Sequence, residues 1–221
     1  MNIKDLWSAA KETGWAMESW TDVNPCVNIQ YLAKLAGWIP VGTRAGEGPV
    51  SNLRPVSQSE ARAKTMSSVY GLQSQPLHVD GSHMLRPPDI IVLFSAEPST
   101  TPTRIWKPTP NEIDRDAACH GLFLIGTGRS AFLAPLAETM GKDWKYRYDP
   151  VIMKPADDRA RAVAKFFDEE SNQKSIQIKW KEPNMLLLIH NRRVLHGRGA
   201  VADTDHDRTL LRMAFYTGEN S

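Results

Sequence analysis

Cysteine is scarce in this chain, and long apolar runs are missing. The two cysteines, Cys26 and Cys119, show no Cys-x-x-Cys spacing, so neither a disulfide framework nor a structural zinc site is indicated. The first residues carry no apolar signal core, and no apolar run approaches the roughly 18 residues that a membrane span needs. We therefore expect a reducing, cytoplasmic location, with neither export nor membrane insertion.

An excess of charge of one sign is also missing. Lysine and arginine number 27 against 25 aspartate and glutamate, a net charge of +2, which leaves no electrostatic footprint for nucleic acid. The composition thus gives no support to a nucleic-acid substrate. The 221 residues fit a single domain, 1–221, that is large enough to bury its own core.

The most informative motif is His78-Val79-Asp80, together with the distant His196. Alternate residues of an extended segment project to the same side, so His78 and Asp80 can bind one ion together. Two histidines and one carboxylate occupy one face of an octahedral iron(II) and leave the other face open, as in non-haem iron oxygenases. We predict that these three residues are metal ligands.

The surroundings of the motif favour this interpretation. His-x-Asp alone is short enough to arise by chance among solvated loop residues. Here, however, His78 and Asp80 precede the apolar segment Ile90-Ile91-Val92-Leu93-Phe94, and His196 follows the apolar segment Met185-Leu186-Leu187-Leu188-Ile189. Both candidate segments therefore lie at the ends of predicted buried strands.

These motifs resemble the taurine dioxygenase and clavaminate synthase-like family of iron(II)/2-oxoglutarate oxygenases. The resemblance spans roughly residues 53–216, with the metal motif ahead of Pro87-Pro88 and the segment Asn191-Arg192-Arg193-Val194-Leu195-His196-Gly197-Arg198 before a final strand. It implies a mostly β, α+β fold with a double-stranded β-helix (jelly-roll) core and flanking helices. Fe(II), 2-oxoglutarate and dioxygen are the implied cofactors and cosubstrates.

The final strand carries two arginines on one face, Arg208 and Arg212, because apolar and other residues alternate over 208–216. A guanidinium supplies the planar, two-pronged donor that the far carboxylate of 2-oxoglutarate needs. By resemblance, Arg208 and Thr103 bind this carboxylate, and Arg212 lies near the substrate. The alternatives are two surface arginines, a threonine that only favours a strand, and an Arg212 neutralised by Asp203, Asp205 or Asp207.

The chain departs from the family pattern at His190, where many relatives have an aspartate, and this leaves the support of His196 in question. His190 is either a third histidine near the metal or a structural residue. His83 is interpreted as part of the rim of the site. Val79 replaces a common threonine, and its side chain points away from the metal.

We predict a helical packing segment and lid over residues 1–52 and the jelly-roll core over 53–221. Residues 42–55 are rich in glycine and proline and form the predicted flexible lid, and 67–75 also help to choose the substrate. Helices are expected at 3–20, 27–38, 111–118 and 157–171, and strands at 122–125, 144–148, 176–180 and 185–189. The tryptophans near the start, Trp7, Trp15, Trp20 and Trp38, are expected to pack in the core.

The predicted function is iron(II)- and 2-oxoglutarate-dependent hydroxylation of a C–H bond in a small metabolite that carries a carboxylate, with release of succinate and CO2. The carboxylate ligand Asp80 disfavours halogenation, because related halogenases carry a small residue there. Two alternatives remain: the same chemistry on a protein or nucleic-acid residue, and a non-catalytic metal-binding jelly-roll module. The sequence does not indicate an oligomeric state.

Overall fold

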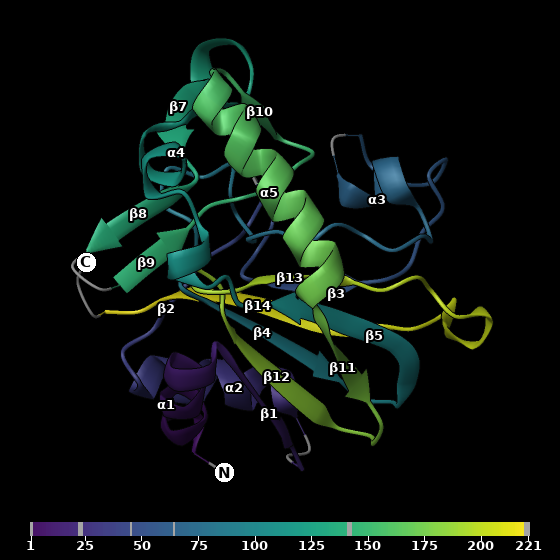
Figure 1. Cartoon of the computed structure of the whole chain (residues 1–221). Helices are drawn as coiled ribbons and strands as arrows, with labels where there is room; N and C mark the ends of the chain where they lie inside the picture. The colour runs from purple at the N-terminus through teal and green to yellow at the C-terminus, as the bar shows by residue number, and fades with distance from the viewer. Residues whose placement is uncertain (1, 22–23, 45, 64, 141–142, 219–221) are drawn as a thin grey trace.

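The computed structural model describes residues 2–21, 24–44, 46–63, 65–140 and 143–218 (Figure 1). Its largest sheet has six strands in the order β1-β12-β4-β14-β2, with β3 also paired to β14. All of these pairings are antiparallel. The strands are β1 (Trp15–Ser19), β2 (Ile39–Pro40), β3 (Val50–Leu53), β4 (Ile90–Ser95), β12 (Met185–His190) and β14 (Leu210–Tyr216).

Both faces of this sheet are covered, which explains why its central strands are apolar at nearly every position. Ile90, Val92 and Phe94 of β4 pack into a cluster with helices α1 (Ile3–Thr13) and α2 (Pro25–Leu35). Ile91 and Leu93 face the other way, into a cluster with a second sheet. Alternating residues of one strand thus serve two separate layers.

The second sheet consists of β5 (Ser99–Trp106), β11 (Ile176–Trp180) and β13 (Leu195–Arg198), in the order β11-β5-β13. An isolated antiparallel bridge between His78 and His196 adds the segment around residue 78 to its β13 edge. The two sheets pack face to face around buried side chains that include Ile105, Ile178 and Trp180. The predicted class, mostly antiparallel β with few helices, is confirmed.

A third layer covers the outer face of the second sheet. It contains α4 (Arg115–His120), α5 (Asp158–Lys174) and small sheets formed by β6 (Leu122–Ile125), β7 (Phe132–Pro135), β8 (Ala137–Met140), β9 (Asp143–Tyr146) and β10 (Met153–Pro155). Short elements elsewhere are α3 (Met66–Tyr70) and the 3₁₀ turns Pro110–Glu112, Gly128–Ser130 and Asp203–Asp205. Figure 1 shows α5 lying on the side of the sheets opposite α1 and α2.

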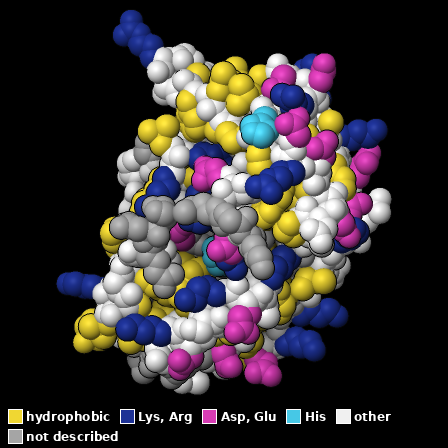
Figure 2. Space-filling view, turned by 60° about the vertical axis from the view of Figure 1, so that its left-hand side comes forward, with side chains coloured by type: hydrophobic (Ala, Val, Ile, Leu, Met, Phe, Trp, Pro, Cys, Tyr) yellow, Lys and Arg dark blue, Asp and Glu magenta, His cyan; other side chains and the backbone are white. Residues whose placement is uncertain are grey.

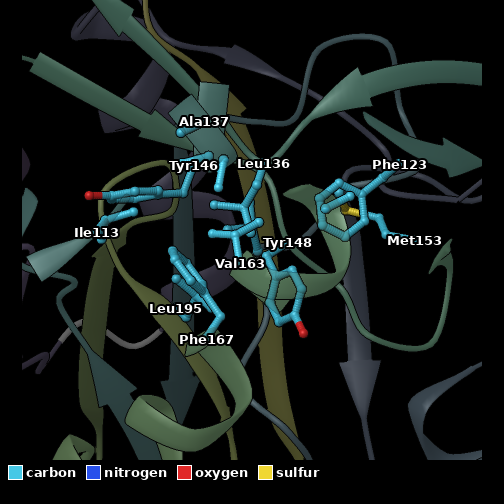
Figure 3. Close-up of a cluster of buried hydrophobic side chains, with 14 of the residues drawn as sticks. Ile113, Phe123, Leu136, Ala137, Tyr146, Tyr148, Met153, Val163, Phe167 and Leu195 are labelled. Carbon is cyan, nitrogen blue, oxygen red and sulfur yellow. The ribbon is translucent and has the colours of Figure 1, made fainter. Parts of the chain in front are cut away.

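Phe167 of α5 lies at the centre of the cluster that joins this layer to the second sheet. Its ring centroid lies 5.1 Å from that of Trp106, 5.5 Å from that of Tyr148 and 5.8 Å from that of Tyr146. Figure 3 shows Phe167, Tyr148 and Leu195 side by side in this cluster. Leu77 and Val79, which flank His78, are buried in the same cluster, so α5 supports the metal motif from behind.

The expected helix over 3–20 is wrong in its second half. The helix ends at Thr13 because Gly14 adopts φ of 99°, a left-handed conformation that glycine takes without strain. Trp15–Ser19 then forms β1, which pairs with β12 and completes one edge of the main sheet. Residues 1–52 are therefore not only a helical packing segment, because they supply β1, β2 and most of β3.

The remaining expectations differ mainly at element ends. The helix expected at 111–118 begins later, as α4 at Arg115, after a 3₁₀ turn at Pro110–Glu112. The helix expected at 157–171 is α5. Trp7, Trp20 and Trp38 are buried as expected, with Trp15 partly buried. Part of the expected flexible lid at 42–55 is regular structure, since Val50–Leu53 is strand β3.

On the face shown in Figure 2, charges of neither sign form a continuous patch, because acidic and basic side chains are interspersed with apolar ones. Within the described ranges, no helix combines the length and apolar character needed to cross a membrane.

Replacing Phe167 by alanine should lower the free energy of unfolding by about 3–5 kcal/mol, because the side chain is 0% exposed and its removal leaves a cavity. Urea unfolding followed by circular dichroism measures the change. The matched control is Lys165→Ala on the same helix, whose side chain is 77% exposed and which should change stability by no more than about 0.5 kcal/mol. Equal effects of the two substitutions would contradict the central place of Phe167.

Candidate active site

The three predicted metal ligands come together at one end of the space between the two sheets. The backbone N–H of His78 donates to the carbonyl of His196, and the N–H of His196 donates back to His78, each at 2.9 Å. The two histidines therefore lie directly opposite each other on neighbouring strands. Asp80, two residues from His78, projects to the same face.

The ligand atoms of His78, Asp80 and His196 all lie within 4.8 Å of one another. Nε2 of His78 is 3.5 Å from Oδ1 of Asp80, and Nε2 of His196 is 3.8 Å from Oδ2. The two imidazole centroids are 5.2 Å apart. One carboxylate thus lies between two imidazole nitrogens, which is a donor set suited to iron(II).

Asn191 fixes the backbone of the metal motif and was not singled out from the sequence. Its side chain accepts from the N–H of Asp80 at 2.9 Å and donates to the carbonyls of Asp80 at 2.9 Å and Pro88 at 2.8 Å. Asn191 is fully buried, so these bonds are shielded from water. Asn191 is part of the sequence motif that leads to His196, but the sequence alone did not show which backbone groups its side chain would bond.

A glycine next to His196 permits the close approach of the two ligand strands. A side chain at Gly197 would place its Cβ 2.9 Å from the carbonyl oxygen of Pro76 and 3.2 Å from that of Gln75. Nδ1 of His78 lies 3.1 Å from the same Pro76 oxygen. That contact sets the imidazole so that Nε2 faces Asp80.

His190 packs against Trp7, with ring centroids 4.8 Å apart, and it is not part of the cluster of ligand atoms. Burial lowers the pKa of His190 to about 3, so it is neutral. Nδ1 of His196 has no hydrogen-bond partner among the described residues.

Arg212 lies beside the three residues and contacts Asp80. Its Nη1 is 3.3 Å and 3.4 Å from the two carboxylate oxygens of Asp80, Nη2 donates to Thr43 at 2.6 Å, and Nε donates to Ser51 at 3.2 Å. Burial opposes the ionisation of Asp80, but Arg212 and the histidines outweigh it and hold the pKa of Asp80 well below its usual value.

Among the described residues, none of the local aspartates Asp203, Asp205 and Asp207 forms an ion pair with Arg212. Asp205 instead accepts hydrogen bonds from the N–H of Thr101 at 2.6 Å and from the hydroxyls of Ser99 and Thr100. Asp203 and Asp207 make no ion pair with Arg212 within the described ranges. Thr43 and Ser51, from the segment predicted as a lid, are the other partners of this guanidinium.

Arg208 differs from Arg212 because, among the described residues, its guanidinium forms no hydrogen bond or ion pair. Arg208 is partly buried, and its Nε and Nη2 atoms, which are buried, have no hydrogen-bond acceptor among the described residues. It lies over the face of Trp180, 5.7 Å from the ring centroid, a favourable place for a cation. Burial lowers the pKa of Arg208 to about 10, so it remains positively charged near neutral pH.

Thr103 is linked to Arg208 through Trp180. Nε1 of Trp180 donates to the Thr103 hydroxyl at 3.2 Å, which links the threonine to the indole that carries Arg208. On β5, Thr103 lies two residues from Ile105, the register partner of His196, a separation of roughly 7 Å along a strand. Trp180 was missed from the sequence because no motif marks it.

The loop after Asp80 contains His83, whose place on the border of the site stays a prediction. Arg147 holds this loop by donating to the carbonyls of Ser82 at 2.8 Å and Leu85 at 2.7 Å and to that of Met84. The charges of Asp149 and Asp80 raise the pKa of His83 while burial, the larger effect, lowers it, which places His83 near both carboxylates.

Comparison with known proteins agrees with this architecture. Residues 115–214 match the family model described as "Taurine catabolism dioxygenase TauD, TfdA family". Among curated proteins, no sequence match was found. Asparagine oxygenase in complex with Fe(II), 2S,3S-3-hydroxyasparagine and succinate has a similar structure, with a TM-score of 0.75 at 14% identity over 97% of this chain and 78% of that one.

The non-heme iron oxygenase OrfP in complex with Fe, succinate and (3S)-hydroxy-L-Arg is equally similar, with a TM-score of 0.75 at 16% identity over 98% of this chain and 80% of that one. The match to the family model includes His196, Arg208 and Arg212. The resemblance to the TauD-like iron(II)/2-oxoglutarate-dependent oxygenases that the motifs predicted is thereby confirmed, in family match and in fold.

Replacing His78 or His196 by alanine should weaken Fe(II) binding at least tenfold, because each change removes one of three protein ligands. Anaerobic equilibrium dialysis with Fe(II) measures the affinity. The control is His120→Ala, since His120 is exposed on α4 and pairs with Asp116. Stoichiometric, undiminished iron binding by either ligand variant would contradict the assignment.

Proposed function

We propose that this protein is an iron(II)- and 2-oxoglutarate-dependent oxygenase that hydroxylates a C–H bond of a small metabolite bearing a carboxylate, such as an amino acid. The observation that carries the proposal is the unpaired guanidinium of Arg208. A buried charge without a partner is costly. A site that binds a dicarboxylate in each turnover accounts for this arginine.

The residues present fit the implied metal. His78, Asp80 and His196 offer two imidazole nitrogens and a carboxylate from one side, and this set favours iron(II) with positions left for other ligands. When bound, iron(II) with 2-oxoglutarate and dioxygen supplies oxidising power, because decarboxylation to succinate and CO2 accompanies insertion of one oxygen atom into a C–H bond. The carboxylate of Asp80 favours hydroxylation over halogenation.

The chain supplies binding and orientation for the cosubstrate. Arg208 would donate two parallel hydrogen bonds to the far carboxylate of 2-oxoglutarate, and the Thr103 hydroxyl would donate a third. Trp180 holds Thr103 by a hydrogen bond and covers one face of the guanidinium. Around them, the apolar side chains of the two sheets exclude water and so strengthen these charged contacts.

Arg212 is proposed to bind the anionic group of the substrate. Its guanidinium lines the ligand cluster and contacts Asp80 at 3.3 Å, so a group held by Arg212 would lie beside the metal. The similar structures support a small substrate, since one holds hydroxyasparagine and another hydroxyarginine. Both of those compounds are amino acids with a carboxylate.

The two alternative functions are less well supported. A non-catalytic metal-binding module has no need for a partly buried arginine whose Nε and Nη2 lack hydrogen-bond acceptors among the described residues. A nucleic-acid substrate would favour a basic surface, whereas the charges on the face in Figure 2 are mixed and the chain's net charge is +2.

The central test is turnover of 2-oxoglutarate. The purified protein with Fe(II) and ascorbate should form succinate from 2-oxoglutarate in an oxygen-dependent reaction. Arg208→Lys should raise the KM for 2-oxoglutarate about tenfold or more, because lysine keeps the charge but loses the two-pronged geometry. Arg104→Lys is the control, since Arg104 contacts Ser74 and Ser175 instead. An unchanged KM in Arg208→Lys would remove Arg208 from the cosubstrate site.

A separate test addresses Arg212. Arg212→Ala should suppress the succinate formation that depends on added substrate, while the visible absorption band of the anaerobic iron and 2-oxoglutarate complex persists. The physical reason is that the lost guanidinium binds substrate rather than cosubstrate. Loss of the band itself would show that Arg212 acts through Asp80 on the metal, and full activity with a substrate lacking any acidic group would equally contradict the proposal.

A further inference from the structure

Asp149 faces the candidate active site but has no part in the function proposed so far. It belongs to the segment Tyr146–Asp149, which runs beside the metal motif, since the N–H of Val79 donates to the carbonyl of Tyr148 at 2.8 Å. Tyr146 and Tyr148 point into the core beneath α5. Alternate residues of an extended segment point the opposite way, and Arg147 accordingly reaches the loop after Asp80.

The effect of Asp149 on the pKa values of neighbouring groups agrees with a side chain that points toward the site. Its negative charge raises the pKa of His78, of His83 and of Tyr70, so it lies within reach of a metal ligand and of the border of the site. In return, the charge of Asp80 raises the pKa of Asp149. The carboxylate of Asp149 is therefore a second negative charge at the site, beyond the one in the ligand cluster.

The carboxylate is held firmly by one oxygen only. Oδ1 accepts from the N–H of Val151 at 2.8 Å and of Ile152 at 3.3 Å, which fixes the side chain over the turn that follows. Over the described part of the chain, Oδ2 has no hydrogen-bond donor, and no arginine or lysine forms an ion pair with Asp149. Asp149 is partly buried, and this burial is the largest influence on its pKa, which it raises, while the charge of His78 lowers it.

A turn alone does not explain the charge. An asparagine would accept the same two backbone hydrogen bonds through its Oδ1 without bringing a partly buried negative charge next to Asp80. A positively charged group placed at Oδ2 would offset the lost solvation and form a charge-assisted hydrogen bond. The arrangement is therefore complementary to a cation, and no lysine or arginine among the described residues occupies that place.

We propose that Asp149 is a specificity residue that binds an ammonium or guanidinium group on the side chain of the substrate. Arg212 and Asp149 belong to different parts of the fold, because Arg212 is on β14 of the main sheet and Asp149 follows Tyr148, whose carbonyl accepts from Val79 of the metal motif. A substrate held by its carboxylate at Arg212 and by its cationic end at Asp149 would present the carbons between them to the metal. This inference rests on the proposed function and narrows its substrate class to basic amino acids.

The test compares amino acids that differ in side-chain charge. Binding is measured anaerobically, as the shift of the absorption band of the iron and 2-oxoglutarate complex on adding L-arginine, L-lysine or L-ornithine, and is compared with L-citrulline, L-norleucine and L-glutamate. We expect at least one basic amino acid to bind about tenfold or more tightly than its uncharged analogue. Asp149→Asn should abolish that preference, with an unchanged band before the amino acid is added.

The matched control is Asp168→Asn. Asp168 is a neighbouring carboxylate on α5, but it accepts from the Tyr148 hydroxyl at 2.6 Å on the core side of the segment, so its replacement should leave the preference intact. The inference is overturned if no basic amino acid binds more tightly than its uncharged analogue, or if Asp149→Asn retains the preference. A second variant, Asp149→Glu, keeps the negative charge and should retain the preference, which separates loss of the charge from a failure to fold. A missing band in the unmodified protein would instead contradict the proposed function.

Discussion

A reciprocal pair of backbone hydrogen bonds between His78 and His196 is the constraint on which the site depends. It joins the metal motif, which otherwise lies in a loop, to the edge of the second sheet, and it sets two imidazoles opposite each other. Val79, between the ligands, is anchored in the cluster beneath α5. The alternation of side chains along one short segment therefore divides it between core packing and metal binding.

The remaining charged side chains differ in whether the protein itself supplies a partner of opposite charge. Arg212 and Asp80 are paired, so their burial is compensated within the protein. Among the described residues, Nε and Nη2 of Arg208 have no hydrogen-bond acceptor, and no lysine or arginine forms an ion pair with Asp149. Buried or partly buried charges without partners are unfavourable for folding. We propose that charged ligands offset them, the cosubstrate at Arg208 and the substrate at Asp149.

The clustering of His78, Asp80 and His196 and the fold class could be predicted because their signals are local. The spacing of His78 and Asp80 and the apolar strand before His196 are visible in sequence, and both follow from the two-residue period of strands. The strand Trp15–Ser19 was missed, since the apolar pattern of the preceding helix continues across Gly14 and only its φ of 99° reveals the break. Trp180 and the contact between Arg212 and Asp80 depend on how distant segments pack, which one sequence does not contain.

Anomalous diffraction at the iron absorption edge, from crystals grown anaerobically with Fe(II) and 2-oxoglutarate, tests the positions of the metal and the cosubstrate most directly. We predict one strong anomalous peak between His78, Asp80 and His196, with the far carboxylate of 2-oxoglutarate against Arg208 and Thr103. A peak at another place, or a cosubstrate bound away from Arg208, would contradict it.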